Sequence, residues 1–222
     1  MTKSNKEAWS GFNLGRPLFT TPGIEEYDRW MARKLARLLR GKQVIADYGS
    51  GDGAWCEYLA ANYPAKRFIA VEWNMTTYGY MVAVRKPGLM NLETIQADMT
   101  LDEGVVPCDF FLCFGGLEHS SDHAEVLKRW VSKLTPGGEC IITVPNLLSR
   151  EWLKNRCGID TKDVAGLDRV VINSYGYEEL WSPNYLVKFV MEAGLEIREF
   201  GLIETLNSDL YIIGSKRVDK NV

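Results

Sequence analysis

VIADYGSGDGAW, residues 44–55, is the stretch that decides the fold. It places Gly49, Gly51 and Gly53 between an apolar run typical of a buried strand and a sequence typical of a helix. Glycine permits a tight turn and a close approach of a ligand to the backbone. The free N–H groups at the start of the helix would then face that ligand, with the positive end of the helix dipole behind them. The stretch therefore predicts a ligand site at a strand-to-helix turn.

The glycine turn on its own is compatible with more than one ligand. Gly49, Gly51 and Ala54 also satisfy G-x-G-x-x-A, the pattern of turns that bind dinucleotides. A plain strand-to-helix turn that holds no ligand is a further interpretation. The choice among these interpretations depends on residues outside the turn.

Apolar runs alternate with helical patterns along the chain. Strands are expected at residues 44–47, 68–71, 92–96, 110–114, 139–144, 196–202 and 209–214. Helices are expected at residues 24–40, 54–63, 75–85, 122–134 and 183–193. A short polar link joins the last two strands, which favours an antiparallel pair. The alternation predicts a doubly wound α/β fold, with a mostly parallel sheet and helices on both faces.

Two stretches lie outside this regular alternation. Residues 1–42 are expected to form an N-terminal helical cap, and residues 147–181 a lid-like insertion after the fifth strand. In the helix at 122–134, Asp122 and Glu125 have the spacing of a capping box. Since no repeat, low-complexity tract or linker marks a boundary, residues 1–222 are interpreted as a single domain.

Composition narrows the possible classes of protein. The 222 residues are 46% hydrophobic and 25% charged, and their net charge of −3 is not the basic balance of a nucleic-acid binder. Five cysteines without a C-x-x-C pair fit reduced thiols. The first ten residues hold no apolar signal region, and no apolar run reaches about 18 residues. We therefore expect a cytoplasmic monomer or homodimer, with no membrane or nucleic-acid partner.

Residues beyond the turn distinguish between the possible ligands. Residues 47–53 fit an acidic residue followed by G-x-G-x-G, Glu72 ends the second strand in FIAVEW, and Asp98 follows the third strand. With FGGLEHSSD after the fourth strand and LTPGGECIITVPN around the fifth, the chain resembles class I S-adenosylmethionine-dependent methyltransferases over roughly residues 44–214. The resemblance implies a seven-stranded mixed sheet in the order 3-2-1-4-5-7-6, with the last strand antiparallel, and S-adenosylmethionine as cofactor.

The resemblance also implies roles for the residues around the turn. Gly49, Gly51 and Gly53 would form the loop near the methionine part of the cofactor. Asp47 would help to hold the ammonium group, directly or through water. Glu72 would accept hydrogen bonds from the ribose hydroxyls, a feature that dinucleotide-binding enzymes share.

Further residues would surround the adenine and the sulfonium. Asp98 would accept a hydrogen bond from the adenine amino group, with Trp73 and Met99 on the two faces of the ring. A helix-packing role for Trp73 remains an open alternative. The backbone at Phe114 and Gly115 would line the sulfonium end of the site.

Only two histidines are present, and one of them is a candidate general base. His119 lies just past the fourth strand, where ligands bind in sheets of this kind, although a structural role is equally open. His123 falls in the first turn of the next helix and is expected to be solvated. Glu118 and Asp122 could form a metal site with these histidines. We expect no metal, because the nearest thiol, Cys113, sits inside a strand.

The acceptor pocket is expected to come from the N-terminal cap and the lid-like insertion, since loops at this edge carry specificity. Aromatic side chains there could stack on an acceptor or could form the core of the lid itself, and arginines could bind an anionic group or remain in solvent. The candidate substrate residues are Trp9, Tyr27, Asn146, Arg150 and Tyr177.

These observations favour a methyltransferase that acts on an oxygen or nitrogen atom of a small molecule. Two alternatives remain open. One is a protein or peptide methyltransferase, which would show an open acidic groove in place of a closed aromatic pocket. The other is a catalytically silent subunit that binds the cofactor and a partner. The complete glycine motif argues against a loss of cofactor binding.

Overall fold

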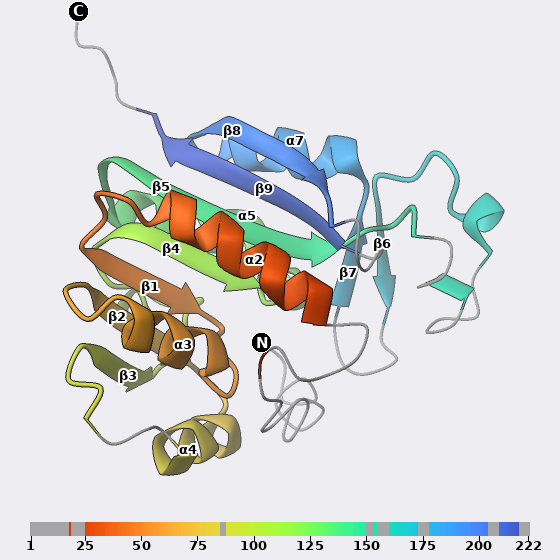
Figure 1. Ribbon diagram of the computed structural model, residues 1–222. Coiled ribbons are helices and arrows are strands. Elements are labelled where there is room, and N and C mark those ends of the chain that lie inside the picture. The colour runs from red at the N-terminus through yellow and green to blue at the C-terminus, as the bar shows by residue number, and fades with distance from the viewer. Residues whose placement is uncertain are drawn as a thin grey trace, which may run out of the picture.

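The computed structural model describes residues 18, 25–84, 88–149, 153–154, 160–172, 178–203 and 209–217. A seven-stranded sheet in the order β3-β2-β1-β4-β5-β9-β8 forms the centre of the molecule (Figure 1). Its strands are β1 (Val44–Tyr48), β2 (Arg67–Glu72), β3 (Leu92–Gln96), β4 (Cys108–Phe114), β5 (Leu134–Pro145), β8 (Leu195–Leu202) and β9 (Asp209–Lys216). Strands β1 to β5 pair in parallel, and β9 runs antiparallel to both β5 and β8. Because β8 and β9 are the sixth and seventh strands of this sheet, the predicted order is confirmed.

Helices cover both faces of the sheet (Figure 1). Among the described residues, the helices longer than one turn are α2 (Glu25–Leu38), α3 (Ala54–Asn62), α4 (Met75–Val84), α5 (His123–Lys133) and α7 (Pro183–Glu192). Leu35 of α2 and Leu59 of α3 pack with Phe110 in one core cluster. Trp130 of α5 and Leu186 of α7 belong to the cluster on the opposite face. The doubly wound arrangement predicted from the sequence is therefore confirmed.

The strand sequences explain why both faces of the sheet are buried. In β1, Ile45 belongs to one core cluster and Ala46 to the other, because successive side chains of a strand point to opposite faces. In β4 the neighbouring pair Phe110 and Phe111 divides in the same way. Continuous apolar runs of this kind are typical of central parallel strands.

The insertion after β5 contains structure that the sequence patterns did not predict. Strands β6 (Arg169–Ile172) and β7 (Glu178–Trp181) form a separate antiparallel pair beyond the end of β5 (Figure 1). A small cluster of its own supports this hairpin, made of Leu147, Leu153, Val164, Ile172 and Leu180. Each strand is only four residues long, with β6 mostly exposed and β7 mostly buried, so neither shows a clear alternation.

The expected capping box at the start of α5 is wrong. Within the described part of the chain, no side-chain hydrogen bond caps this helix at Asp122. The backbone N–H of Asp122 instead donates to the hydroxyl of Ser120 at 3.3 Å. Glu125, the other half of the expected box, accepts a hydrogen bond from Lys128 at 2.7 Å. Hydrogen bonds with Ser120 and Lys128 therefore take the place of the capping box that the spacing of Asp122 and Glu125 predicts.

The described cysteines agree with the expectation of reduced thiols. Cys56, Cys108, Cys113 and Cys140 are free and buried, as expected for cysteines that act as small hydrophobes. Cys157 lies outside the described residues. Among the described helices, none combines the length and the apolar character needed to cross a membrane.

Candidate active site

The glycine turn joins β1 to α3 and is held against β2. The N–H groups of Gly49 and Ser50 both donate to the carbonyl of Val71, at 3.0 and 3.1 Å. Gly49, Gly51 and Gly53 all have positive φ angles, of 77°, 59° and 77°. Residues with a side chain rarely adopt this backbone conformation, so the turn depends on glycine at each position.

Gly51 and Gly53 are needed for different reasons. A β-carbon on Gly53 would lie 2.6 Å from the sulfur of Met81, so Gly53 allows α3 to pack close to α4. A β-carbon on Gly51 would have no atom of the described residues within 4 Å. Gly51 therefore borders open space beside the turn, where a ligand could approach the backbone. This arrangement fits a bound cofactor.

Glu72 links the end of β2 to the glycine turn. One carboxylate oxygen accepts a hydrogen bond from the N–H of Gly51 at 2.9 Å, and the other accepts from the N–H of Asn74 at 2.8 Å. The side chain is buried, and this burial raises its pKa above the usual value. The backbone of Trp73 donates a further hydrogen bond to this carboxylate, and the lone-pair capacity that is left can accept a hydrogen bond from a hydroxyl group. The expected role of Glu72 toward the ribose is therefore chemically possible, and it stays a prediction.

Asp47 is a second buried carboxylate at the end of β1. The thiol of Cys56 donates a hydrogen bond to it at 3.5 Å. Burial raises the pKa of Asp47 to about 7, and the negative charges of Glu72 and Asp52 contribute to this rise. A cationic group placed nearby would favour the ionised carboxylate. The ammonium end of S-adenosylmethionine would supply such a cation.

The residues expected around the adenine follow β2 and β3. Asp98 is half-buried, and its Oδ1 accepts hydrogen bonds from the N–H and the hydroxyl of Thr100, at 2.9 and 2.6 Å. Trp73 is half-buried and packs against the core. Met99 is buried, with its methyl carbon 3.2 Å from the place that a β-carbon on Gly49 would take. Contact of these three side chains with adenine stays a prediction.

Phe114 and Gly115 bring the end of β4 to the same edge as the glycine turn, since β1 and β4 are neighbours. The N–H of Gly115 donates to the carbonyl of Thr143 at 3.2 Å, and its φ angle is 66°. The ring of Phe114 packs edge-on against Trp55, with 5.9 Å between the centroids. The positions of both residues are compatible with the expected sulfonium end.

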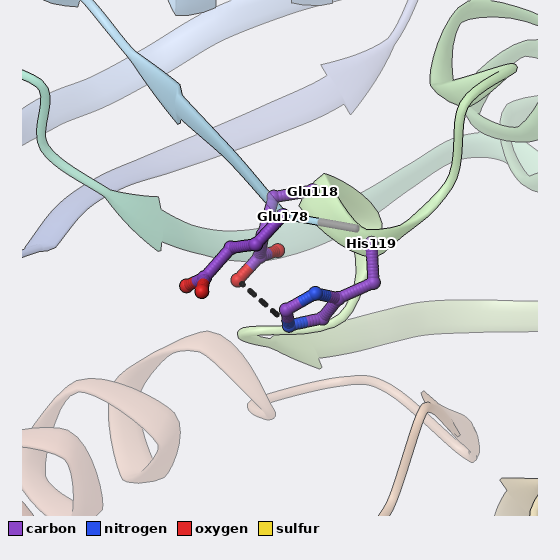
Figure 2. A group of neighbouring side chains, drawn as sticks. All are labelled: Glu118, His119 and Glu178. Atoms are coloured by element: carbon purple, nitrogen blue, oxygen red, sulfur yellow. Dashed lines mark ion pairs between the residues drawn. The ribbon is translucent and has the colours of Figure 1, made fainter. Parts of the chain in front are cut away.

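His119 lies in the short helix η2 (Leu117–His119), directly after β4. Its ring is buried, and Nε2 lies 3.8 Å from a carboxylate oxygen of Glu118 (Figure 2). Glu178, at the start of β7, extends into the same group. Burial raises the pKa of Glu118 well above its usual range, and the charges of Glu178 and Asp209 raise it further. Sequence patterns missed Glu178 because it belongs to the irregular insertion.

His123 is buried, so the prediction that solvent surrounds it is wrong. One ring nitrogen lies 2.8 Å from the hydroxyl of Tyr185 in α7, and the other lies 3.2 Å from the carbonyl of Ser120. Glu179 of β7 is 3.7 Å away. The ring of Trp181 packs against the imidazole at 4.9 Å. His123 therefore joins the insertion and α7 to the start of α5, which is a structural role.

The candidate substrate residues divide into two groups. Tyr27 of α2 is 8% exposed and belongs to the core, and Asn146 is buried at the end of β5. The side-chain oxygen of Asn146 accepts a hydrogen bond from the N–H of Leu148 at 3.0 Å, which stabilises a turn. Contact of either side chain with an acceptor stays a prediction. The remaining candidates, Trp9, Arg150 and Tyr177, lie outside the described residues.

Comparisons with known proteins agree with this geometry. The family described as a methyltransferase domain matches residues 24–199. Trans-aconitate 2-methyltransferase of Escherichia coli is 25% identical over 173 residues, which cover 72% of this chain and 67% of the relative. An S-adenosylmethionine-dependent methyltransferase from Mesorhizobium loti has a similar fold, with a TM-score of 0.67, 14% identity, and coverage of 89% of this chain and 100% of that one. The N-methyltransferase NodS from Bradyrhizobium japonicum, solved with S-adenosyl-L-homocysteine, gives a TM-score of 0.63 at 15% identity, with 97% of each chain covered.

The family match spans most of the chain, including the glycine turn, Glu72 and the segment around His119. The strand order and the open space beside Gly51 fit that assignment. The chain therefore belongs to the methyltransferase domain family and is a class I enzyme that uses S-adenosylmethionine.

Proposed function

We propose that this enzyme methylates an oxygen or nitrogen atom of a small molecule. The main support is the buried position of Glu118 and His119 at the end of β4, 1% and 7% exposed. A small acceptor can reach two side chains this deeply buried more easily than a folded protein can. The relative from Escherichia coli is named for a small acceptor, trans-aconitate, which is consistent with this class of substrate.

The residues of the chain would act mainly by positioning. The glycine turn and Glu72 would hold the cofactor. The core clusters on the two faces of the sheet keep the turn and Glu72 in place. S-adenosylmethionine, when bound, supplies a methyl group that is already activated for displacement. Alignment of the acceptor with that methyl can account for much of the acceleration.

His119 is proposed to take a proton from the acceptor where the reacting atom carries one. Its ring lies at the carboxyl end of β4, the edge at which ligands bind in such sheets. The adjacent carboxylate of Glu118, 3.8 Å from Nε2, would stabilise the imidazolium that forms. A base of this kind contributes about a hundredfold or more to the rate.

We propose further that residues 147–181 form a lid over the acceptor and residues 1–42 a cap. The separate cluster beneath β6 and β7 supports the first of these, because it gives the insertion its own packing. We also expect a monomer or homodimer in the cytoplasm without a nucleic-acid partner, a proposal that the net charge of −3 supports.

A transfer assay tests the proposed acceptor class directly. Cofactor with a tritiated methyl group is incubated with the enzyme and with either metabolite fractions or protein fractions of a cell extract. We expect label in metabolites of low molecular mass. Labelling confined to the protein fractions would instead support a protein or peptide methyltransferase, and labelling of neither would favour a catalytically silent subunit.

A further inference from the structure

Glu118, His119 and Glu178 form a compact group, and a role of His119 as a base does not explain why two carboxylates lie beside it. One potential ligand atom from each side chain lies within 4.8 Å of the other two. Figure 2 shows the two carboxylates running alongside each other, with the ring of His119 turned toward the same space. Two segments that are far apart in the sequence, η2 and β7, therefore bring two oxygen donors and one nitrogen donor together.

One oxygen of this group lacks a partner. The side chain of Glu118 is only 2% exposed, and its Oε2 accepts no hydrogen bond from the described residues. Leaving a buried carboxylate oxygen unsatisfied is costly. An orphaned, buried oxygen in this group therefore indicates a missing ligand.

The spacing of the donors is compatible with a shared ion. The 3.8 Å between Oε1 of Glu118 and Nε2 of His119 exceeds the usual hydrogen-bond length of about 2.7–3.2 Å. Bonds of about 2.0–2.2 Å from each donor to a metal place two donors roughly 3–4.5 Å apart. The pair is therefore too far apart for a direct hydrogen bond and well placed to hold one cation between them.

Charge around the group also favours a cation. The carboxylates of Glu178 and Asp209 lie close enough to Glu118 for their charges to act on it. Negative charge of this kind attracts a cation and repels an anion.

We propose that Glu118, His119 and Glu178 bind one divalent metal ion that positions an oxygen-bearing acceptor for methylation. In this arrangement His119 is a ligand and not the base proposed above, and the ion takes over the activation of the acceptor oxygen. Two carboxylate oxygens with one imidazole nitrogen suit Mn²⁺ or Zn²⁺ better than Ca²⁺ or Mg²⁺, which prefer oxygen ligands alone. This proposal departs from the expectation, drawn from the sequence, that no metal is bound, and Glu178 played no part in that expectation. The metal-binding step stands independently, while its role toward the acceptor rests on the proposed function.

The group adjoins the cofactor side of the molecule. Oε1 of Glu118 lies 3.4 Å from the place that a β-carbon on Gly115 would take. Gly115 is the residue expected to line the sulfonium end. A hydroxyl or carboxylate oxygen of the acceptor that completed the coordination of the ion would therefore lie beside the backbone at the end of β4.

Titration of the metal-free full-length enzyme with Mn²⁺, in the absence of cofactor and acceptor, tests this proposal. Calorimetry counts the sites, and electron paramagnetic resonance reports the loss of free Mn²⁺. We expect one saturable site, a lower affinity for Mg²⁺, and a higher melting temperature with the metal. Glu118→Gln, Glu178→Gln and His119→Ala should each weaken binding by about tenfold or more. Asp122→Asn and Glu125→Gln should bind Mn²⁺ like the natural protein.

The outcomes separate this proposal from the proposed function. Absence of a saturable Mn²⁺ site, or equal losses in the control variants, would overturn the metal site. If the group of Glu118, His119 and Glu178 binds a cationic amine in place of a metal, no saturable Mn²⁺ site will be found, and the metal proposal is then wrong. Cofactor binding and methyl transfer measured on the same preparations would then show whether the methyltransferase function still stands. Glu178→Gln is the second variant in case Glu118→Gln unfolds, since Glu178 is only half-buried.

Discussion

The cofactor side and the acceptor side of the site differ in how their carboxylates are held. On the cofactor side, both oxygens of Glu72 accept backbone hydrogen bonds from residues near it in the fold, at 2.9 and 2.8 Å. On the acceptor side, Glu118 has an orphaned oxygen and faces Glu178 from a distant hairpin. The first arrangement is complete without any ion, whereas the second needs a proton, an amine or a metal. This contrast indicates that the two sides can be disturbed separately.

The largest effect should come from Gly51→Val. A side chain at this position would fill the open space beside the turn and would force a residue with a β-carbon into a φ angle of 59°. We expect the affinity for S-adenosylmethionine to fall by about a hundredfold or more, which is about 2.7 kcal/mol, in a calorimetric titration. Gly137→Val is the matched control. Gly137 also has a positive φ, of 72°, and no described atom within 4 Å of its would-be β-carbon. Equal losses of affinity in both variants would show that backbone strain, and not the ligand space, is responsible.

His119→Ala should lower the turnover number by about a hundredfold while the affinity for the cofactor changes little. The reason is that His119 groups with Glu118 and Glu178, and none of the cofactor contacts expected above falls on it. Steady-state kinetics and calorimetry on the same preparation measure the two effects. A variant with nearly normal turnover would show that His119 is structural and that alignment carries the catalysis.

Glu72→Ala should give the opposite pattern. Loss of hydrogen bonds to a charged group costs about 1.5–3 kcal/mol, or roughly ten- to a hundredfold in affinity for the cofactor. The loss includes the bond from the N–H of Gly51, which orients the turn. Glu93→Gln in β3 is a control, because Glu93 is exposed and pairs with Arg67. A change of less than twofold in Glu72→Ala would remove Glu72 from the cofactor site.

Asp47 should make cofactor binding depend on pH. Burial raises its pKa to about 7, so in the free protein the carboxyl is largely protonated below that pH. A bound ammonium group favours the ionised form, and binding then releases a proton. Affinity should therefore rise about tenfold from pH 6 to pH 8 and level off above it. Calorimetry across this range checks the slope. Asp47→Asn should flatten it, and a natural protein with no slope would place the ammonium elsewhere.

His123→Ala should have the smallest effect on catalysis. The substitution removes contacts with Tyr185 and Trp181 that join α7 and the insertion to the start of α5. The free energy of unfolding should fall by about 1–3 kcal/mol, as for a buried hydrogen-bonding group left unpaired. Thermal and denaturant unfolding measure this change. The turnover number per folded molecule should stay within a fewfold of the natural value, and a loss as large as that of His119→Ala would place His123 in the active site.

The same contrast explains what could be predicted from the sequence. The strand order, the glycine turn and the position of Glu72 come from consecutive β-α units, so local periodicity and motifs indicate them. The environment of His123 and the approach of Glu178 to His119 depend on β7, which packs from far along the chain. Strands of four residues without clear alternation leave no such signal. The prediction of a cap at Asp122 was wrong for a related reason. The spacing of two residues does not determine which nearby group forms a hydrogen bond with them.

Single-turnover transfer of a tritiated methyl group most directly tests the separation of the two sides. The acceptor fraction identified by the labelling assay is used with Glu72→Ala and His119→Ala, each at saturating S-adenosylmethionine. We predict that Glu72→Ala recovers most of the natural rate under saturation, because its defect is in cofactor affinity. His119→Ala should remain about a hundredfold slower at every cofactor concentration. Recovery of both variants, or of neither, would contradict the division of the site into a cofactor side and an acceptor side.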